Sequence, residues 1–550
     1  MRFVFITGGV ISSLGKGLTA AALGALFKGR GLKVALRKLD PYLNVDPGTL
    51  SPYQHGEVFV MQDGTEADLD CGHYERFAGV QTTFADCTTT GQVYQKVLEA
   101  ERRGDYLGKT VQIVPHITDA IKGFLTHGEE DRDVLIAEIG GTVGDIEGLP
   151  FLDAIRQLRQ RRPQDVCFVH VGWVPYVKTA GEYKTKPLQH SVRELQRGGI
   201  QPDILLLRCD EKLPGDILDK VGLFCNVPAS RVVCGTTQKN IYAVPLAYHD
   251  EGLDQAVLDF FSLESGKPAL DVWQDYRQRF ESASQTVVVG VVGKYGSFPD
   301  AYRSLYEALE HAGVREGICA QIQWIDPENI PEQFSNTEAV RGSDEPAVDA
   351  ILVPGGFGVR GLQGTLDMIR WARENKVPYF GICLGMQLAV IEVARNLLGL
   401  AKADSSEFSK TPDPVVHTLT SWEKEGAVHD YAGDSRGLGG TMRLGAYPCR
   451  VKEGSLAHRI YGKSEFHERH RHRFEVNTAY EDGLEKAGLI FSGKSPCGRL
   501  PEIVEHNDHP FFIAVQFHPE FLSEPHAGHP LFRAFVKAAA QCRDQKKESA

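Results

Sequence analysis

The chain has 550 residues, which corresponds to about three to four domain-sized units of roughly 100–200 residues each. Hydrophobic residues make up 42% and charged residues 24%, a globular composition that excludes extensive disorder and collagen-like repeats. Lysine and arginine number 60 against 72 acidic residues, for a formal charge of −12. Because nucleic-acid binding needs a dominating basic surface, we expect no nucleic-acid partner.

Membrane and secretory signals are missing from the sequence pattern. No apolar run approaches the ~20 residues of a membrane helix, and the first residues lack the apolar stretch of a signal peptide. The eleven cysteines are odd in number and are never spaced Cys-x-x-Cys, which disfavours disulfide frameworks and zinc sites. The sequence therefore predicts a cytoplasmic protein with no membrane partner.

The first half of the chain alternates short apolar strands with helices. A strand at 3–7 leads into a glycine loop and a helix at 16–29, and further strands are predicted at 34–36, 134–138, 166–171 and 204–207. This alternation is typical of a buried parallel sheet in an α/β fold. Residues 40–62 are rich in Pro, Gly and Tyr without periodicity, and we interpret them as a long functional loop.

The regular pattern lapses at 264–285 and restarts with strands at 286–292, 320–324, 350–353 and 377–381. We expect one domain at 1–266, a linker at 267–285 that includes a polar helix, a second α/β domain at 286–542 and a frayed polar tail at 543–550. The interval 401–440 is rich in glycine and charge. It is interpreted as a mobile loop or insertion, and its role is left open.

A glycine loop links the first strand to the first helix. It runs from Gly8 to Gly17 and carries Lys16 directly before Gly17. Backbone N–H groups in such a loop form an anion cradle, and the lysine reaches the outer phosphates. The pattern departs from Gly-x-x-x-x-Gly-Lys-[Ser/Thr] because it is one residue longer and has Gly17 in place of the hydroxyl residue that binds magnesium.

Carboxylates elsewhere must then supply the metal ligands. Asp70 belongs to the acidic segment 68–70, and Glu138 ends a hydrophobic strand. Ligands of open α/β sheets bind at the carboxyl ends of the strands, and phosphate-bound magnesium takes one or two carboxylates. Asp70 and Glu138 are therefore the candidate Mg²⁺ ligands, although a cap or a solvated acid is an equal alternative for Asp70.

A nucleophile motif occupies the second half. Cys383 lies in a Gly-x-Cys-x-Gly turn between a strand and a helix, a setting that exposes the thiol near a helix N-terminus. Downstream, His518 offers a base, and Glu520 would share its face on an extended segment. The glycine-rich stretch 353–358 can lend backbone N–H groups to an oxyanion.

These residues resemble two known families. Cys383, His518 and Glu520 occupy the triad positions of a class I glutamine amidotransferase domain. The first half resembles the CTP synthase family over six motifs, and the second half adds one more; they lie at 12–17, 38–42, 54–60, 72–77, 138–147, 184–187 and 468–477. The resemblance implies a P-loop-like, Rossmann-type parallel sheet domain joined to a C-terminal α/β class I glutaminase domain.

The activity implied by the resemblance is a ligase reaction that forms a C–N bond. ATP would phosphorylate the 4-oxygen of UTP, and ammonia from L-glutamine, or free ammonia, would displace the phosphate to give CTP, the last step of pyrimidine nucleotide synthesis. Mg²⁺ would assist ATP. The family also implies activation by GTP, product inhibition by CTP and a homotetramer.

Site residues carry over position by position. The implied ATP-binding residues are Ser13, Leu14, Gly15, Lys16, Gly17, Leu18, Lys38 and Asp70. The implied UTP- and CTP-binding residues are Ser12, Asp145, Ile146, Glu147, Lys184, Thr185, Lys186, Pro187, Leu188, Gln189 and Lys220. The implied glutamine-binding residues are Gly356, Leu384, Gly385, Met386, Gln387, Glu407 and Arg473, and His55 and Val58 would line an ammonia passage.

Two alternatives stay open at this point. One is another glutamine-dependent amidoligase, acting for example on a carboxylate of a cobalamin precursor, against which the segments 184–189 and 144–147 favour UTP. The other is an ATP-driven partitioning or scaffold protein, which would usually carry an earlier lysine in the glycine loop. His470 and His472 resemble a metal site but lack a third ligand nearby.

Overall fold

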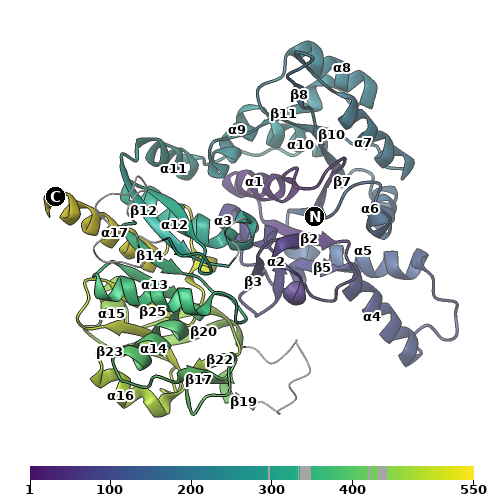
Figure 1. Cartoon of the computed structure of the whole chain (residues 1–550). Coiled ribbons are helices and arrows are strands. Elements are labelled where there is room, and N and C mark those ends of the chain that lie inside the picture. The colour runs from purple at the N-terminus through teal and green to yellow at the C-terminus, as the bar shows by residue number, and fades with distance from the viewer. Residues whose placement is uncertain are drawn as a thin grey trace. The chain divides into compact units, whose positions relative to one another are not determined.

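The computed structural model describes residues 1–294, 296, 298–331, 334, 348–418, 421–424, 427–430 and 443–549. The chain divides into two compact units (Figure 1). The first unit comprises Met1–Pro47 and Ala67–Arg277, and the second comprises Gly48–Glu66 and Gln278–Ala550. The division after Arg277 falls inside the predicted linker, where α11 (Asp271–Ser282) lies. The short segment 48–66 belongs to the second unit despite its place in the sequence.

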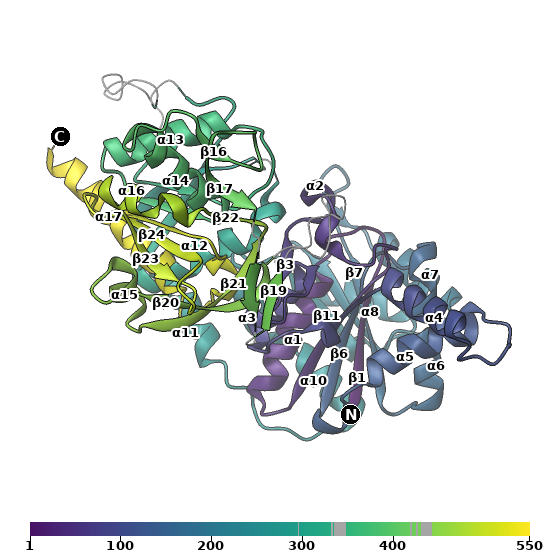
Figure 2. The same ribbon diagram turned by 90° about the horizontal axis from the view of Figure 1, so that it is seen from below.

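The first unit is built on a parallel sheet in the order β11-β10-β7-β1-β6-β2-β5. Phe3, Val4, Phe5 and Ile6 of the central strand are fully buried, which explains the continuous apolar run, since helices cover both faces. Figure 2 shows α1 and α10 on one face and α5 and α6 on the other. The strands are β1 (Arg2–Gly8), β2 (Val34–Asp40), β5 (Cys87–Thr89), β6 (Val134–Ile139), β7 (Val166–Trp173), β10 (Ile204–Cys209) and β11 (Val232–Thr236).

The helices of the first unit are mostly amphipathic and follow the strands. They are α1 (Lys16–Gly29), α3 (Asp70–Ala78), α4 (Thr90–Arg103), α5 (Thr118–Thr126), α6 (Leu149–Arg161), α7 (Lys186–Arg197), α8 (Gly215–Cys225), α9 (Val244–Asp250) and α10 (Leu253–Phe261). The helix α1 begins directly after the glycine loop, which places the loop at the carboxyl end of the sheet. The small strands β8 (Tyr176–Val177) and β9 (Glu182–Tyr183) form a separate hairpin.

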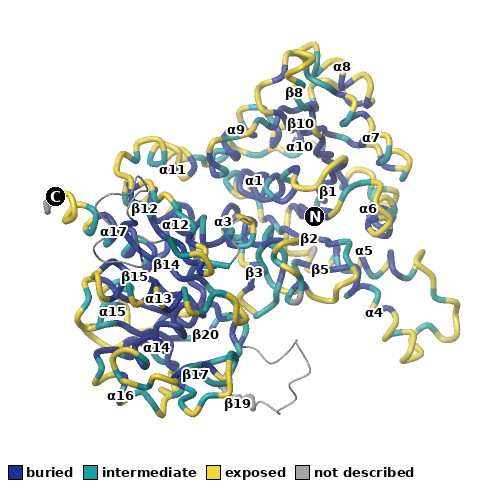
Figure 3. Tube along the Cα trace, in the orientation of Figure 1, coloured by how far each residue is buried: buried dark blue, intermediate teal, exposed yellow. Residues whose placement is uncertain are grey.

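The second unit contains a mixed sheet in the order β13-β12-β14-β15-β25-β24-β23-β20-β21. The first five strands are parallel and the others antiparallel. They are β12 (Gln285–Val292), β13 (Ile318–Ile325), β14 (Ala350–Val353), β15 (Tyr379–Ile382), β20 (Arg443–Val451), β21 (Glu465–His472), β23 (Leu489–Lys494), β24 (Pro501–His506) and β25 (Phe512–Val515). In Figure 3 these strands are largely buried, while the outer helices carry the exposed residues.

Two hydrophobic cores lie on opposite faces of this sheet. One packs against α13 and α14, and the other against α12 and α17. The helices of the second unit are α2 (Pro52–His55), α12 (Arg303–Glu316), α13 (Leu362–Glu374), α14 (Leu384–Asn396), α15 (Leu456–Tyr461), α16 (Glu481–Lys486) and α17 (Pro530–Ser549). Smaller strands are β3 (Val58–Val60), β16 (Ala403–Ser405), β17 (Asp413–Thr418), β18 (Ser421–Lys424), β19 (Ala427–Asp430) and β22 (Phe474–Val476), while β4 (Glu66–Asp68) pairs with β3.

Three local predictions differ from the structure. The predicted loop 40–62 contains α2 and β3, which are held in part by residues far away in the sequence, such as Arg469, whose side chain donates to the carbonyl of Val60. The tail after residue 542 continues α17 as far as Ser549 instead of fraying at 543. The interval 401–440 holds β16 to β19, while 419–420, 425–426 and 431–440 lie outside the described residues. Along the described part of the chain, no helix has the length and apolarity to cross a membrane.

Candidate active sites

The glycine loop adopts a conformation that suits anion binding. Val10, Ser13 and Gly15 have positive φ angles of 81°, 59° and 84° before α1 starts at Lys16. The Nζ atom of Lys16 donates a hydrogen bond to the carbonyl oxygen of Gly141 at 2.6 Å, and burial lowers the pKa of this lysine. Gly141, in the loop after β6, therefore orients the Lys16 side chain, which is expected to contact the outer phosphates.

Gly17 has a steric reason to be glycine. A Cβ atom at this position would lie 1.8 Å from Oδ1 of Asp70, far inside contact distance. The carboxylate of Asp70, at the start of α3, thus fills the place where the usual motif has a serine or threonine hydroxyl. Gly17 lacks the hydroxyl of the common phosphate-loop pattern, and α3 supplies the carboxylate of Asp70 at that position instead.

Lys38, at the end of β2, is surrounded by four carboxylates. Its Nζ atom forms a short ion pair with Asp70, lies 3.0 Å from Oε1 of Glu138, and lies 3.7 Å from both Asp40 and Asp68. Burial alone would lower the pKa of Lys38, but these carboxylates raise it well above its ordinary value. Together with Lys16, the cluster carries two positive and up to four negative charges.

This donor set suits a divalent cation. Glu138 is buried and Asp70 half-buried beside the phosphate loop, and the excess of carboxylates leaves negative charge that a cation would neutralise. Burial and neighbouring carboxylates raise the pKa of Asp68 to about 7 and that of Asp40 to about 6, which reflects this excess. Among the described residues, no group of three or more His, Cys, Asp or Glu already stands in metal-holding geometry.

The residues expected to bind UTP and CTP lie in different environments. Lys184 pairs with Glu182, whose pKa is lowered mainly by its hydrogen bond to Lys184 and to a smaller extent by Lys220. The side chain of Gln189 is buried, donates to Thr185 at 3.0 Å and has an unpartnered Oε1. Leu188 is fully buried in the core. The remaining expected residues are exposed or half-buried on loops and at the start of α7: Ser12, Asp145, Ile146, Glu147, Lys186 and Pro187.

In the second unit, Cys383 occupies a strained turn between β15 and α14. Its φ of 51° and ψ of −100° are unusual for a residue with a side chain, and its N–H donates to the carbonyl of Val515 at 2.7 Å. Both flanking glycines are sterically required. A Cβ at Gly381 would lie 2.8 Å from the backbone of Gly385, and one at Gly385 would lie 2.3 Å from the carbonyl oxygen of Val353.

His518 and Glu520 lie beside this turn. Nδ1 of His518 donates to Oε1 of Glu520 at 2.7 Å, and both side chains are almost buried. Burial would lower the pKa of His518, but the negative charges of Glu520 and Cys383 outweigh it and raise the pKa to about 10. The extended segment expected between the two residues is instead a 3₁₀ turn over Pro519–Leu522, so the predicted reason for their proximity is wrong although the proximity itself is present.

A cavity of about 190 Å³ opens onto the thiol. It is lined by Cys383, His518 and Glu520, by the glycines 355 and 356, and by Gly48, Leu50, Pro52, Glu57 and Val58 of the segment 48–66. A Cβ on Gly355 would lie 2.6 Å from Cε1 of His518, which explains why a residue with a side chain does not fit at position 355. Val58 thus lines this cavity, while His55 is exposed on α2.

Two arginines that sequence reasoning missed hold this segment. Arg471 pairs with Glu66 at 2.6 Å and donates to the carbonyl of Gly48 at 3.0 Å. Arg469 donates to the carbonyl of Val60 at 3.0 Å. The alternating Arg/His run of β21 is the sequence pattern that could have indicated these two arginines, because alternate residues of a strand face opposite sides.

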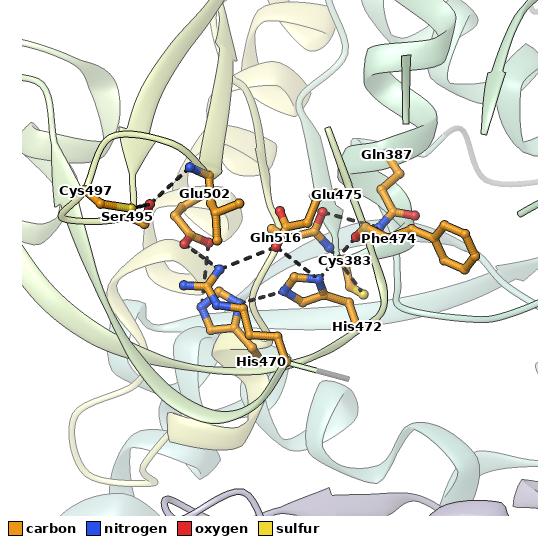
Figure 4. A network of polar contacts seen from close by, with 12 residues as sticks. Cys383, Gln387, His470, His472, Phe474, Glu475, Ser495, Cys497, Glu502 and Gln516 are labelled. Carbon is orange, nitrogen blue, oxygen red and sulfur yellow. Dashed lines mark hydrogen bonds and ion pairs between the residues drawn. The ribbon is translucent and has the colours of Figure 1, made fainter. Parts of the chain in front are cut away.

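Some of the expected glutamine-binding residues line the cavity, and others are buried in the core or hydrogen-bond to the backbone nearby. Gly356 lines the cavity, and Glu407 is half-buried and accepts a hydrogen bond from the N–H of Gly358 at 3.1 Å. Burial raises the pKa of Glu407, and Arg473 lies close enough to oppose that shift. Gln387 donates to the carbonyl of Phe474 at 2.9 Å (Figure 4), and Leu384 and Met386 are buried in the core that packs against α14.

Comparisons with known proteins cover nearly the whole chain. Residues 2–263 match a family model described as CTP synthase N-terminus, and residues 297–538 match one described as glutamine amidotransferase class-I. A CTP synthase from Nitrobacter winogradskyi is 55% identical over 98% of both chains, and one from Rhodopseudomonas palustris is 56% identical over 98% of this chain and 99% of its own. A solved Trypanosoma brucei CTPS glutaminase domain with bound acivicin is 37% identical and covers 46% of this chain and 94% of its own, with a TM-score of 0.40.

These matches define a ligase that carries its own class I glutamine amidotransferase domain. The chain belongs to the CTP synthase family. Its activity is the ATP-dependent formation of CTP from UTP with glutamine as the nitrogen source. The family assignment removes the cobalamin-type amidoligase and the partitioning protein as alternatives.

Proposed function

We propose that the two units divide this reaction, the first activating UTP and the second releasing ammonia. The observation that carries the proposal is the pair of distinct centres, one cationic and carboxylate-rich around Lys16 and Lys38, the other a thiol with a charged imidazole. The domains would then follow the predicted boundaries 1–266 and 286–542, with segment 48–66 contributed by the first domain to the cavity of the second.

In the first centre, the 4-oxygen of UTP attacks the γ-phosphorus of ATP and ADP leaves. Lys16 and the loop N–H groups neutralise and orient the phosphates, and Lys38 is placed to balance charge on the transferred group. Ammonia then adds to carbon 4, the C–O bond breaks, and phosphate and a proton are released with CTP. The uracil-side contacts would come from the expected residues of 184–189, 145–147, Ser12 and Lys220.

Asp70 and Glu138 would hold Mg²⁺, which when bound neutralises phosphoryl charge. Both carboxylates contact Lys38, and Glu138 also accepts from the hydroxyl of Tyr74 at 2.6 Å. These contacts fix the positions of the two side chains. The lysine therefore keeps the carboxylates in place beside the phosphate loop.

In the second centre, the sulfur of Cys383 attacks the side-chain amide of glutamine and forms a thioester. Because the pKa of His518 is raised to about 10, the imidazole carries its proton at neutral pH and can deliver it to the departing ammonia. His518 then accepts a proton from the water that hydrolyses the thioester to glutamate. Glu520 stabilises the imidazolium in both steps.

Further family properties remain part of the proposal. His55 and Val58 would line the passage for ammonia, which must stay unprotonated to act as a nucleophile. Gly356, Gln387, Glu407 and Arg473 would hold the glutamine substrate. Activation by GTP, product inhibition by CTP, a homotetramer and a cytoplasmic location are predictions from the sequence.

The test separates the two centres. Cys383→Ala should abolish glutamine-dependent CTP formation and preserve ammonia-dependent formation, measured by ultraviolet absorbance with UTP, ATP and Mg²⁺. Lys16→Ala should remove both. Cys319→Ala, an exposed cysteine on β13, is the matched control and should behave as the parent chain. If Cys383→Ala eliminates both reactions while remaining folded, the proposed division is wrong.

A further inference from the structure

His170 is a buried ionisable residue that takes no part in the reaction steps proposed above. It lies on β7, is fully buried, and is the register partner of Thr7 on the neighbouring strand β1. Nδ1 of His170 lies 2.9 Å from the hydroxyl oxygen of Thr7, and Nε2 lies 2.7 Å from the hydroxyl oxygen of Ser191 on α7. The imidazole therefore connects two hydroxyl groups from different elements, and we call these three residues the His170 bridge.

The His170 bridge is buried along its whole length and carries no charge. Thr7 is 0% exposed and Ser191 is 3% exposed. Burial, and to a smaller extent the charge of Lys16, lowers the pKa of His170 to about 3, so the ring is neutral at physiological pH. A neutral imidazole donates from one nitrogen and accepts at the other, and a hydroxyl can do either. Both contacts are therefore satisfied hydrogen bonds.

The Thr7 end of the bridge directly precedes the phosphate loop. Gly8 follows Thr7, and a Cβ at Gly8 would lie 3.0 Å from Cδ and 3.2 Å from Cγ of Lys16. The alkyl chain of Lys16 thus lies against the residue next to the bridge. A displacement at this end of β1 would move the lysine that is expected to contact the outer phosphates.

The Ser191 end of the bridge belongs to the helix that carries expected UTP-binding residues. Residues 186–189 form the first turn of α7, and Ser191 lies in the second turn. A Cβ at Gly172 of β7 would lie 1.9 Å from Cδ1 of Leu188, so this first turn packs directly against the strand that carries His170. The position of α7 is therefore set at β7 and at Ser191.

Ser191 also contacts the phosphate loop itself. A Cβ at Gly9 would lie 1.9 Å from Oγ of Ser191 and 2.9 Å from its Cβ. Gly9 does not have a positive φ angle, so glycine is required there for steric reasons and not for its backbone conformation. The separation between the phosphate loop and α7 is thus fixed by a hydroxyl group that His170 holds in place.

This separation matters because the reaction joins two bound nucleotides. In the proposed reaction, the 4-oxygen of UTP attacks the γ-phosphorus of ATP, with ATP on the phosphate loop and UTP on the elements that include α7. The reacting atoms must lie about 3–3.5 Å apart and in line. A misplacement of about 1 Å costs on the order of 10²-fold in rate. Residues that set the position of α7 can therefore control the rate without contacting either nucleotide.

We propose that His170 is a positioning residue of the synthase centre. Its imidazole connects the hydroxyl of Thr7, at the end of β1, to that of Ser191 on α7, and this connection holds the helix expected to bind UTP against the loop expected to bind ATP. The inference rests on the proposed assignment of the two nucleotides to these elements. Because His170 contacts neither nucleotide, it acts on the alignment of the bound substrates and not on the affinity for either one.

Two substitutions of His170 test the bridge, with ammonia as the nitrogen source so that the glutaminase centre is not needed. His170→Phe has a ring but no polar atoms, and kcat for CTP formation should fall ~10-fold or more. His170→Gln keeps a donor and an acceptor on its amide, so kcat should stay within ~3-fold of the parent. The dissociation constants of UTP and of a non-hydrolysable ATP analogue, each measured alone, should change less than ~3-fold in both variants.

A double-mutant cycle tests whether the bridge acts as one unit. Thr7→Val removes one hydroxyl at nearly constant volume, and Ser191→Ala removes the other. Each single variant should lose ~10-fold in kcat, and the double variant should lose no more than either alone, because one broken hydrogen bond already opens the bridge. Losses that multiply would indicate two independent packing defects and would overturn the proposal.

His311→Phe, in the second unit, is the matched control. His311 is also fully buried, and its Nδ1 lies 3.0 Å from the hydroxyl of Ser523. Loss of this hydrogen bond should lower the melting temperature about as much as His170→Phe does, while the ammonia-dependent kcat stays as in the parent chain. The comparison separates a loss of stability, which removal of any buried histidine can cause, from a loss of substrate alignment.

Three results would overturn the assignment of His170. They are a folded His170→Phe protein with the parent kcat, a dissociation constant for UTP or the ATP analogue that rises ~10-fold with kcat unchanged, and a kcat of His170→Gln as low as that of His170→Phe. If His170→Phe does not fold, the cycle of Thr7→Val and Ser191→Ala still decides. A parent chain that forms no CTP from ammonia would refute the proposed function, whereas a loss confined to the variants concerns only the bridge.

Discussion

The tight contact beneath the Cys383 turn gives a measurable prediction for Gly385→Ala. Gly385 lies in the first turn of α14 with an ordinary helical conformation, so the effect of the substitution is steric. The new Cβ would lie 2.3 Å from the carbonyl oxygen and 3.1 Å from Cβ of Val353. Carbon–oxygen contacts normally begin at about 3.3 Å, so α14 or β14 must move by about 1 Å.

That displacement acts on the nucleophile more than on stability. A shift of about 1 Å in a catalytic group costs ~10²-fold in rate, while overpacking costs about 1–3 kcal/mol. We therefore expect glutaminase kcat, measured as glutamate release, to fall ~10²-fold. Ammonia-dependent CTP formation should change less than 2-fold, because the first centre shares no residue with this turn, and a change of 2-fold is only about 0.4 kcal/mol.

The control is Gly123→Ala on α5, where the added Cβ meets open space. This variant should keep both activities and gain about 0.5–1 kcal/mol from helix propensity. A Gly385→Ala protein with undiminished glutamate release would refute the argument that the separation of α14 and β14 sets the position of the thiol.

Two further predictions concern ion pairs of the second unit. Glu520→Gln should lower glutamate release by at least ~10³-fold. Because the pKa of His518 is raised from 6.5 to about 10, its stabilising pair with Glu520 should be fully present below pH 6.5 and lost as pH approaches 10. The melting temperature of the parent should therefore exceed that of Glu520→Gln at pH 6 and converge with it near pH 10, and a constant difference would contradict the assignment. Arg471→Ala should speed proteolytic cleavage within 48–66, because it removes the ion pair with Glu66. The control Arg370→Ala removes an exposed ion pair and should leave the cleavage rate unchanged. Equal cleavage rates in the two variants would show that Arg471 does not hold the segment.

The sequence was most informative where a short local pattern fixes structure. The helix predicted at 16–29 coincides with α1, because the glycine loop and the apolar run that follows set its start locally. The strands at 350–353 and 166–171 were found for the same reason, since strands buried on both faces are continuously apolar. The glycine-flanked Cys383 turn was also readable, because such a turn needs glycine on both sides.

Other features have no local pattern. The elements α2 and β3 inside the predicted loop 40–62 have no sequence period, and the segment makes contacts with residues hundreds of positions away, such as the hydrogen bond from the N–H of Ser304 to Glu57 at 3.1 Å. The reason for Gly17 was also hidden, since only the fold brings Asp70 against it. Likewise, the alternation in β21 predicts two faces, but not that Arg471 meets Glu66 on one face while His470 meets Glu502 on the other.

The sequence by itself determined the α/β class, the positions of the glycine loop and the cysteine turn, and, through resemblance, the family. Those features depend on residues adjacent in the chain, whose periodicity and backbone preferences are local. Only the tertiary structure decided which carboxylates surround Lys38 and which buried groups stand behind Cys383. Charge and hydrogen bonding act through space, and the chain brings these groups together only when its sheets have formed.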